Sequence, residues 1–184
     1  MNITETLFTG RPNEPRTPRE ERCYDFLDAL GIEYFRVDHE HADTIQDCEL
    51  VEGLLGAKIC KNLFLTNRQQ TDFYLLIMPG EKPFKTKLLS KQIQTARLSF
   101  GTPEQMERYL DTLPGSASVL GLLNDRENAV RLIVDRDLLA EPTFGCHPCQ
   151  NTSSLRFQTA DLFERVLPAM HHEPTFVELP WTPE

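Results

Sequence analysis

Apolar positions recur along this chain with two periods, which predict helices and strands in alternation. Thr17 and Pro18 supply an N-cap and a proline at the first helical position, and apolar residues keep helical spacing until Gly31. A second predicted helix runs from Thr44 to Leu55 and is ended by Gly56. Three further helices are expected over 86–93, 102–110 and 159–170, the last two capped by Thr102 and Thr159.

Short apolar runs between these helices predict strands. Lys61–Thr66 and Phe73–Met78 flank a polar turn, a pattern typical of a hairpin that contains a buried strand. Other strands are expected over 33–37, 97–100, 130–134, 155–157 and 175–179, and one that begins at Phe144. Because hairpins are mixed with helices, the sequence predicts an α/β (α+β) fold whose sheet is mixed rather than all parallel.

The chain of 184 residues is long enough for one domain. Residues 1–16 contain Gly10, Pro12 and Pro15 and no periodic apolar pattern, so we expect a flexible N-terminal arm followed by a domain over 17–184. No window of eighteen residues is entirely apolar, and the N-terminus lacks the basic and apolar segments of a secretory signal. We therefore expect no membrane contact and a cytoplasmic location.

Charge is unevenly distributed. The net charge of −9 argues against a general nucleic-acid binder, because phosphate neutralisation needs Lys and Arg. The segment 81–97 nevertheless concentrates cations against Glu81 alone, which makes it a candidate stripe for binding the phosphates of an RNA or, equally, a solvated helix face. Its cations are Lys82, Lys85, Lys87, Lys91 and Arg97.

The five cysteines are an odd number, which argues against a secreted disulfide scaffold. Cys23 and Cys60 lie in apolar surroundings and are predicted to be buried thiols. Cys146 and Cys149 form a Cys-x-x-Cys pair, which suggests a redox pair or half of a zinc site. A second ligand pair is missing, and only folding could bring up the nearest candidates, His39, His41 and Cys48.

Three short stretches are candidates for chemistry. Lys61 and Asn62 open an apolar strand, where a lysine could hold a phosphate, polarise a carbonyl or simply guard the strand end. The small residues from Gly115 to Ser118 would let a ligand approach the backbone, whose N–H groups bind oxyanions or phosphates. His147 lies in a third stretch, the loop of residues 145–154.

The order and spacing of these stretches resemble the YbaK/prolyl-tRNA-synthetase-associated domain family, and within it the freestanding prolyl-tRNA deacylases of the PrdX type. The match extends from Pro18 to Pro174 and includes Arg97-Leu98-Ser99-Phe100, Leu122-Leu123-Asn124-Asp125 and Asn151-Thr152. The resemblance implies a curved sheet and helices around a small pocket. It also implies hydrolysis of the ester between a mischarged amino acid, here expected to be alanine, and the terminal adenosine of tRNA-Pro.

The resemblance also implies roles for individual residues. Lys61, Gly115 and His147 would be catalytic, and Asn62 and the loop residues Ser116, Ala117, Ser118 and Val119 would bind substrate. The family loop reads Gly-x-x-x-Pro, so Val119 is a departure that affects substrate choice. The implied partners are the acceptor end of tRNA-Pro and, transiently, prolyl-tRNA synthetase or an elongation factor. No cofactor and no metal are expected.

The corresponding mechanism uses positioning more than reactive side chains, because an aminoacyl ester is already activated. The amides of the Gly115 loop would hold the carbonyl oxygen, and Lys61 would fix the terminal phosphate or ribose. The ribose hydroxyl or His147 would accept the proton of the attacking water. Two alternatives remain: an inactive binding module of the same fold, and a zinc or redox protein built on Cys146 and Cys149.

Overall fold

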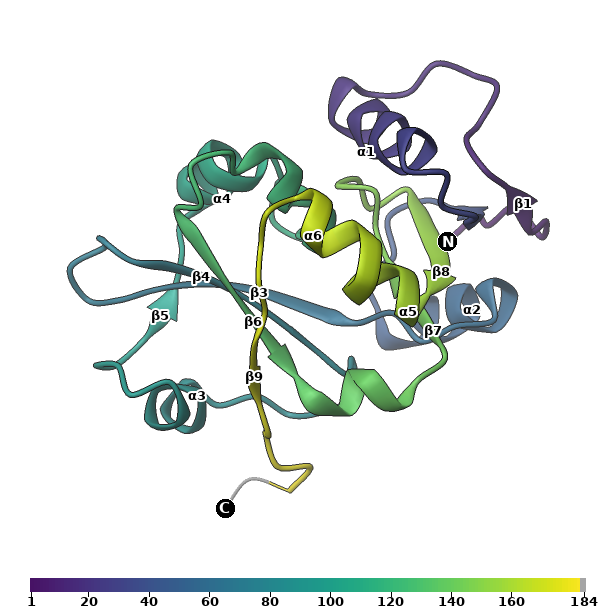
Figure 1. Cartoon of the computed structure of the whole chain (residues 1–184). Helices are drawn as coiled ribbons and strands as arrows, with labels where there is room; N and C mark the ends of the chain where they lie inside the picture. Colours follow the sequence, from purple (N-terminus) through teal and green to yellow (C-terminus); the bar gives the residue numbers. More distant parts are fainter. Residues whose placement is uncertain (183–184) are drawn as a thin grey trace.

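The computed structural model describes residues 1–182 and arranges them as two β-sheets with surrounding helices (Figure 1). The larger sheet has the strand order β5-β3-β4-β6-β9 and the smaller one the order β1-β2-β8-β7. The strands are β1 Phe8–Thr9, β2 Phe35–Asp38, β3 Lys61–Thr66, β4 Phe73–Met78, β5 Ser99–Phe100, β6 Val130–Asp135, β7 Thr143–Cys146, β8 Ser153–Gln158 and β9 Thr175–Val177.

The prediction of a mixed sheet is confirmed, although the strands form two sheets instead of one. In the larger sheet β3 is antiparallel to β4 and β5, whereas β6 is parallel to β4 and β9. All pairs in the smaller sheet are antiparallel. The two sheets meet where Ile59, just before β3, forms a bridge with Gly145 in β7.

Helix boundaries follow the capping residues. Thr17 caps α1 (Pro18–Ala29) by accepting a hydrogen bond from the Glu20 amide, and Thr44 caps α2 (Ile45–Leu55), which ends at a left-handed Gly56. Thr102 caps α4 (Pro103–Leu110) in the same way, while α3 covers Thr86–Gln92. These four helices agree with the sequence prediction to within one or two residues at each end.

The C-terminal helix spans 159–169 as predicted but is irregular. It consists of α5 (Thr159–Asp161), a π-helical segment Leu162–Val166 and α6 (Leu167–Ala169). Pro168 has no N–H to donate to the preceding turn, and a local widening of the helix accommodates such a residue. The predicted cap is wrong, because Thr159 is already helical and its buried hydroxyl has no hydrogen-bond partner among residues 1–182.

Two hydrophobic cores lie on opposite faces of the larger sheet. Phe64 in β3 packs in one core with Met106 and Leu110 of α4 and with the C-terminal helix. Leu65, its neighbour in β3, packs in the other core with Leu89 of α3. Successive side chains of a strand point to opposite faces, so β3 separates a face covered by α4 from a face covered by α3.

The N-terminal segment is not a free arm, contrary to the prediction. Thr9 and Phe8 in β1 pair with β2, and Ile3 forms a bridge with His39. Arg16 reaches Asp38 with an Nη2–Oδ2 distance of 3.0 Å. Residues 1–16 therefore form part of the smaller sheet and its surroundings, while the predicted domain end at 184 lies outside the described residues.

Within residues 1–182, no helix is both long and apolar enough to cross a membrane.

Candidate active site

A cavity of about 460 Å³ opens between β3, β5, α4 and two loops that the sequence analysis had singled out. Asn62, Gly115, Ala117 and His147, which come from distant parts of the chain, all line it. Its remaining wall is mostly apolar and consists of Cys60, Leu63, Phe64, Phe100, Gly101, Pro103, Met106 and Pro114. Four of the eight residues expected to be catalytic or substrate-binding therefore share one site.

Asn62 lines this cavity and carries an acceptor without a partner. Its Nδ2 donates to the carbonyl and the sulfur of Cys60, both at 3.3 Å, and its buried Oδ1 has no hydrogen-bond partner among residues 1–182. An unpaired buried acceptor is costly, which makes it a suitable group to receive an N–H from a ligand. Next to it, β5 pairs only with Leu65 and Thr66, so the outer edge of β3 is open at the cavity.

The loop that begins at Gly115 divides its residues between cavity and interior. Gly115 has a φ of +86°, which favours glycine, and it lines the cavity together with Ala117. Neither of their amides donates a hydrogen bond to another group of residues 1–182, whereas the Ser116 amide donates to the Leu113 carbonyl at 2.9 Å. Two backbone donors of lining residues are therefore without a protein acceptor.

The other three loop residues do not line the cavity, which corrects their predicted substrate contact. The Ser116 hydroxyl is buried and accepts from the Asn151 amide at 3.2 Å, so it ties this loop to the loop of His147. Ser118 is buried and caps the 3₁₀ helix Val119–Asn124. Val119, which stands where the family loop has a proline, is a core residue, so its side chain is not part of the pocket floor.

His147 faces the cavity in a defined protonation state. Its Nδ1 lies 2.9 Å from the Ser153 carbonyl, which can only accept, so Nδ1 carries the proton. The pKa of His147 is lowered to about 4, mainly by burial; the bond to Ser153 opposes this shift, and the nearby rings of His39 and His41 add to it. The ring is therefore neutral at pH 7 and Nε2 offers a lone pair.

Lys61 does not line the cavity. Its side chain lies on the α3 face of β3, and Nζ donates to the Lys82 carbonyl at 2.6 Å. Partial burial lowers the pKa of Lys61. The period-two alternation of the strand turns the side chains of Asn62 and Phe64 toward the α4 face and that of Lys61 toward the α3 face. Polarisation of a substrate carbonyl by Lys61, one of the predicted roles, has no support in this geometry.

Lys82 is a structural residue, which corrects its place in the predicted tRNA-binding stripe. It is fully buried, and Nζ donates to Asp135 Oδ2 at 2.8 Å, Asp137 Oδ2 at 2.7 Å and the Leu179 carbonyl at 2.7 Å. Burial opposes its charge, but the two aspartates raise the pKa of Lys82 above its ordinary value. A cation with three protein acceptors is not available to a phosphate.

The other four cations of the stripe are exposed. Lys85, Lys87, Lys91 and Arg97 lie in or near α3 and form no ion pair with any group of residues 1–182. Phe84, which precedes them, packs edge to face on Phe100 at the cavity rim, with ring centroids 6.4 Å apart. The exposed stripe and the cavity are therefore neighbours at the open edge of the larger sheet.

All five cysteines are free thiols. Cys146 and Cys149 are both buried, and the thiol that Cys149 contacts is that of Cys23, with 3.6 Å between the sulfurs. The expected burial of Cys23 and Cys60 is confirmed. Burial raises the pKa of Cys60 to about 12, so the one cysteine that lines this cavity is a thiol at neutral pH. Residues 1–182 contain no group of three or more His, Cys, Asp or Glu placed to hold a metal.

Several lining residues were not assigned a role from the sequence. Met106 and Leu110 are four residues apart in α4, a spacing that predicts one buried face, and Met106 is the member that reaches the cavity. No sequence pattern indicated a role for Gly101. A side chain there would meet the Phe64 ring at 2.5 Å, so glycine is needed for strand and helix to approach.

The chain is similar in sequence to known proteins. The family model described as the aminoacyl-tRNA editing domain matches residues 39–164, more than half of the chain. The prolyl-tRNA editing protein ProX of Acetoanaerobium sticklandii is 29% identical over 143 residues, which are 78% of this chain and 87% of that protein. The prolyl-tRNA synthetase associated domain-containing protein 1 of Danio rerio is 26% identical over 155 residues, 83% of each chain.

Solved structures share the fold. A crystal structure of a candidate trans-editing enzyme for prolyl tRNA synthetase superimposes with a TM-score of 0.66 at 15% identity, covering 90% of this chain and all of that one. A scaffold used for epitope grafting by computational design superimposes equally well, at 14% identity, over 90% of this chain and 99% of its own. At such identities the superpositions establish the architecture alone.

Proposed function

We propose, from the premise that the chain belongs to the aminoacyl-tRNA editing domain family, that it is a deacylase that removes alanine from mischarged tRNA-Pro. The observation that carries this proposal is that four polar groups without a protein partner belong to residues that line one largely apolar cavity: the Asn62 acceptor, the Gly115 and Ala117 amides, and the His147 lone pair. An aminoacyl ester carries matching groups, namely an ammonium, a carbonyl and a carbon open to attack by water.

The polar groups suggest how the ester is held. The ammonium of the amino acid would donate to Asn62 Oδ1, and the ester carbonyl would accept from the free amides of Gly115 and Ala117. These amides would then stabilise the negative charge that develops on the carbonyl oxygen as water attacks. Both contacts fix the ester in one orientation, which is a large part of catalysis for a substrate that is already activated.

His147 would orient the attacking water. Its Nε2 accepts a proton of the water while the water oxygen bonds to the carbonyl carbon. The ester C–O bond then breaks, and the leaving ribose oxygen takes this proton back from His147, which becomes neutral again. A base with a pKa of about 4 is weak, so we assign His147 mainly the positioning of the water, with the ribose hydroxyl as the second candidate proton acceptor.

Selection of alanine would follow from size. The apolar wall formed by Phe64, Pro103 and Met106 has no polar side chain to satisfy, which suits a methyl group. The ring of proline needs more room and would displace the ester from the amides. Such a sieve discriminates by roughly 10- to 200-fold per methylene group. Serine and cysteine are similar in size to alanine and are the competitors to test.

The tRNA would approach along the open edge of the larger sheet. Phe100 is 59% exposed at the rim, so it could stack on the terminal adenine, and the exposed cations near α3 lie beyond it. Lys61 donates one ammonium proton to the Lys82 carbonyl and keeps two on the α3 face of β3, where a phosphate of the acceptor end would pass. In this arrangement Lys61 binds the RNA backbone, one of the roles expected from the sequence.

A deacylation panel tests the proposal. Purified protein is incubated with Ala-, Ser-, Cys- and Pro-tRNA-Pro, and loss of the labelled amino acid is followed at equal enzyme concentrations. We expect Ala-tRNA-Pro to be hydrolysed fastest and Pro-tRNA-Pro to remain charged. Binding of these tRNAs without hydrolysis of any of them would contradict the proposal and identify an inactive module. Preferred hydrolysis of Ser- or Cys-tRNA-Pro would retain the reaction and correct the substrate.

A further inference from the structure

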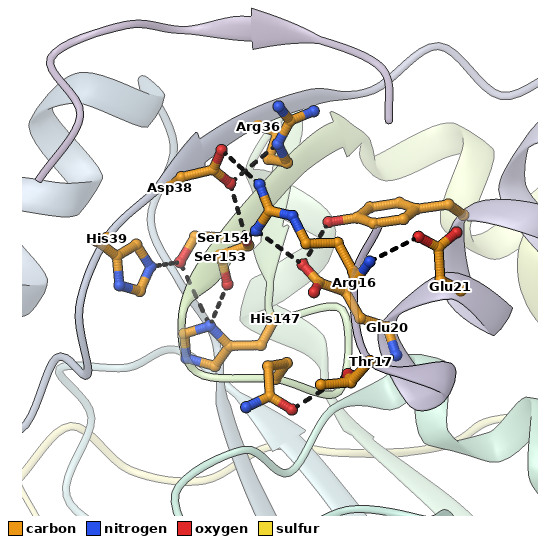
Figure 2. A network of polar contacts seen from close by, with 12 residues as sticks. Arg16, Thr17, Glu20, Glu21, Arg36, Asp38, His39, His147, Ser153 and Ser154 are labelled. Atoms are coloured by element: carbon orange, nitrogen blue, oxygen red, sulfur yellow. Dashed lines mark hydrogen bonds and ion pairs between the residues drawn. The ribbon is translucent and has the colours of Figure 1, made fainter. Parts of the chain in front are cut away.

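His147 is connected through a serine to a second histidine, which lies 115 residues before that serine in the chain. His39 follows β2, and Ser154 lies in β8, where it is fully buried. His39 Nε2 is 2.9 Å from Ser154 Oγ, and Ser154 Oγ is 3.3 Å from His147 Nδ1. Figure 2 shows this chain of contacts beside the network that fixes Ser153.

The direction of each hydrogen bond in this chain is fixed by a backbone carbonyl. His39 Nδ1 is 2.6 Å from the Glu40 carbonyl, which can only accept, so Nδ1 carries the proton of a neutral His39. Nε2 of His39 is then an acceptor, and the Ser154 hydroxyl donates to it. With its proton committed to His39, Ser154 Oγ turns its lone pairs toward Nδ1–H of His147.

Burial supports a neutral His39, because it lowers the pKa of that ring below the ordinary value. Two neighbouring groups act in opposite directions: the negative Asp38 raises this pKa, and His41 lowers it. Asp38 is itself engaged, since it accepts from the Ser153 hydroxyl at 2.8 Å and pairs with Arg16 and Arg36. These bonds hold the Ser153 carbonyl, the first acceptor of His147, in place.

We propose that His39 is a positioning residue for His147: by orienting the Ser154 hydroxyl, it gives Nδ1–H of His147 a second acceptor and keeps Nε2 unprotonated toward the cavity. Without His39 the Ser154 hydroxyl is free to turn and donate to His147 Nδ1. That arrangement favours the other tautomer, in which Nε2 carries the proton and cannot accept one from water. The inference rests on the role proposed for His147.

Two substitutions of His39 separate its contacts. His39→Asn keeps a donor for the Glu40 carbonyl but does not reach Ser154, whereas His39→Gln extends an acceptor to the position of Nε2. We expect His39→Asn to lower kcat/KM on Ala-tRNA-Pro by about threefold to tenfold, the range for one hydrogen bond, and His39→Gln to retain most of the activity. In a His147→Ala background, His39→Asn should have no further effect.

Ser154→Ala provides the decisive control, since it removes the hydroxyl that would turn. Combined with His39→Asn, it should restore activity toward the level of Ser154→Ala alone. If His39 served only the fold, the activity losses of His39→Asn and Ser154→Ala would add in the double variant. His39→Asn would then lower activity in the His147→Ala background as well. Either result overturns the proposal. If His39→Asn unfolds at the assay temperature, the activities of His39→Gln and Ser154→Ala are compared instead. The proposal requires His39→Gln to be the more active of the two.

A spectroscopic measurement tests the same inference without any substrate. The ¹⁵N chemical shifts of the His147 ring report which nitrogen carries the proton. We expect an unprotonated Nε2 in the wild-type protein, a mixture of tautomers in His39→Asn and recovery in His39→Asn/Ser154→Ala. An unchanged His147 spectrum in His39→Asn overturns the positioning role even if the protein is a deacylase. The expected tautomer shift in a protein with no deacylase activity would instead refute the proposed function alone.

Discussion

The two faces of β3 carry different chemistry, although their residues alternate along one short strand. On the α4 face, Asn62 and Phe64 line the cavity together with His147 and the free amides of the Gly115 loop. On the α3 face, Lys61 lies toward the exposed cations of α3 and the buried Lys82. The first face offers neutral polar groups in an apolar enclosure, and the second offers positive charge.

This difference suggests a division of labour across the strand edge. Small neutral groups in a cavity discriminate an amino acid and stabilise a developing oxyanion, while exposed cations bind phosphates with little selectivity. Under the proposed function, the edge of β3 that β5 leaves unpaired would let a single RNA strand pass from one face to the other. Catalysis and affinity should therefore respond to different substitutions.

The largest expected effect is on stability and concerns Lys82, which looks like an RNA ligand in the sequence. Lys82→Met leaves Asp135 buried without its partner, so we expect the free energy of unfolding to fall by about 3–5 kcal/mol. The matched Lys85→Met, at an exposed position, should change it by less than about 0.5 kcal/mol. Urea denaturation of both variants measures this difference, and equal stabilities would refute the structural role.

Removal of the cavity histidine should have the largest effect on catalysis. We expect His147→Ala to lower kcat/KM for Ala-tRNA-Pro by about 10²- to 10³-fold, because the attacking water loses its acceptor. The affinity for tRNA should stay within about twofold. His171→Asn, at an exposed histidine far from the cavity, is the control. A His147→Ala enzyme that retains wild-type kcat would remove His147 from the mechanism.

The exposed cations should control binding. Replacing Lys85, Lys87 and Lys91 together by Gln should weaken tRNA binding by about tenfold or more and reduce the log–log salt slope by about two. The rate at saturating enzyme should change little. Replacing the exposed Arg68 and Arg126 by Gln serves as the charge control. Unchanged affinity of the triple variant at low and moderate salt would mean that α3 is only a solvated helix.

The smallest expected effect is a near absence of pH dependence. With its pKa at about 4, His147 stays neutral between pH 6.5 and 5.5, so the enzyme-dependent rate should change by less than about twofold. An ordinary histidine, with a pKa near 6.5, would lose most of its neutral form over the same range. The substrate amine remains protonated throughout. A rate that fell about fivefold or more would show that His147 is not buried as described.

The same shift has a consequence for folding. The folded-state pKa of His147 lies below its unfolded value, so the unfolded chain binds more protons between about pH 6.5 and 4. Stability should therefore fall as the pH is lowered through this window, and His147→Ala should lose part of that slope. Chemical denaturation at pH 7 and pH 5 measures it. A slope identical in both proteins would contradict the lowered pKa.

Local patterns were sufficient to predict most elements. Two features depend on neighbouring residues alone, and the structure confirms both. They are the hairpin of Lys61–Thr66 with Phe73–Met78 and the helix that begins after Thr44 and ends at Gly56. The irregular C-terminal helix was not predicted, because an interior Pro168 can be accommodated by several local geometries.

Roles that depend on distant partners could not be predicted. Lys82 and Lys85 look alike in the sequence, and only the approach of Asp135, fifty-three residues later, separates a buried ion pair from an exposed cation. Gly115 and Ser116 are adjacent, yet the tether from Ser116 to Asn151 turns one toward the cavity and the other away. The role proposed for His39 depends on Ser154 in β8, which the sequence does not place beside it.

The most direct test of the two-face account compares neighbours on β3. Single-turnover deacylation of Ala-tRNA-Pro, measured over a range of enzyme concentrations, separates the rate at saturation from the half-saturating concentration. Asn62→Ala should lower the saturating rate by about tenfold or more, since the ammonium loses its acceptor while RNA contacts persist. Lys61→Met should instead raise the half-saturating concentration, with a saturating rate within about threefold of wild type. The account is contradicted if Lys61→Met abolishes the saturating rate, or if Asn62→Ala changes only the half-saturating concentration.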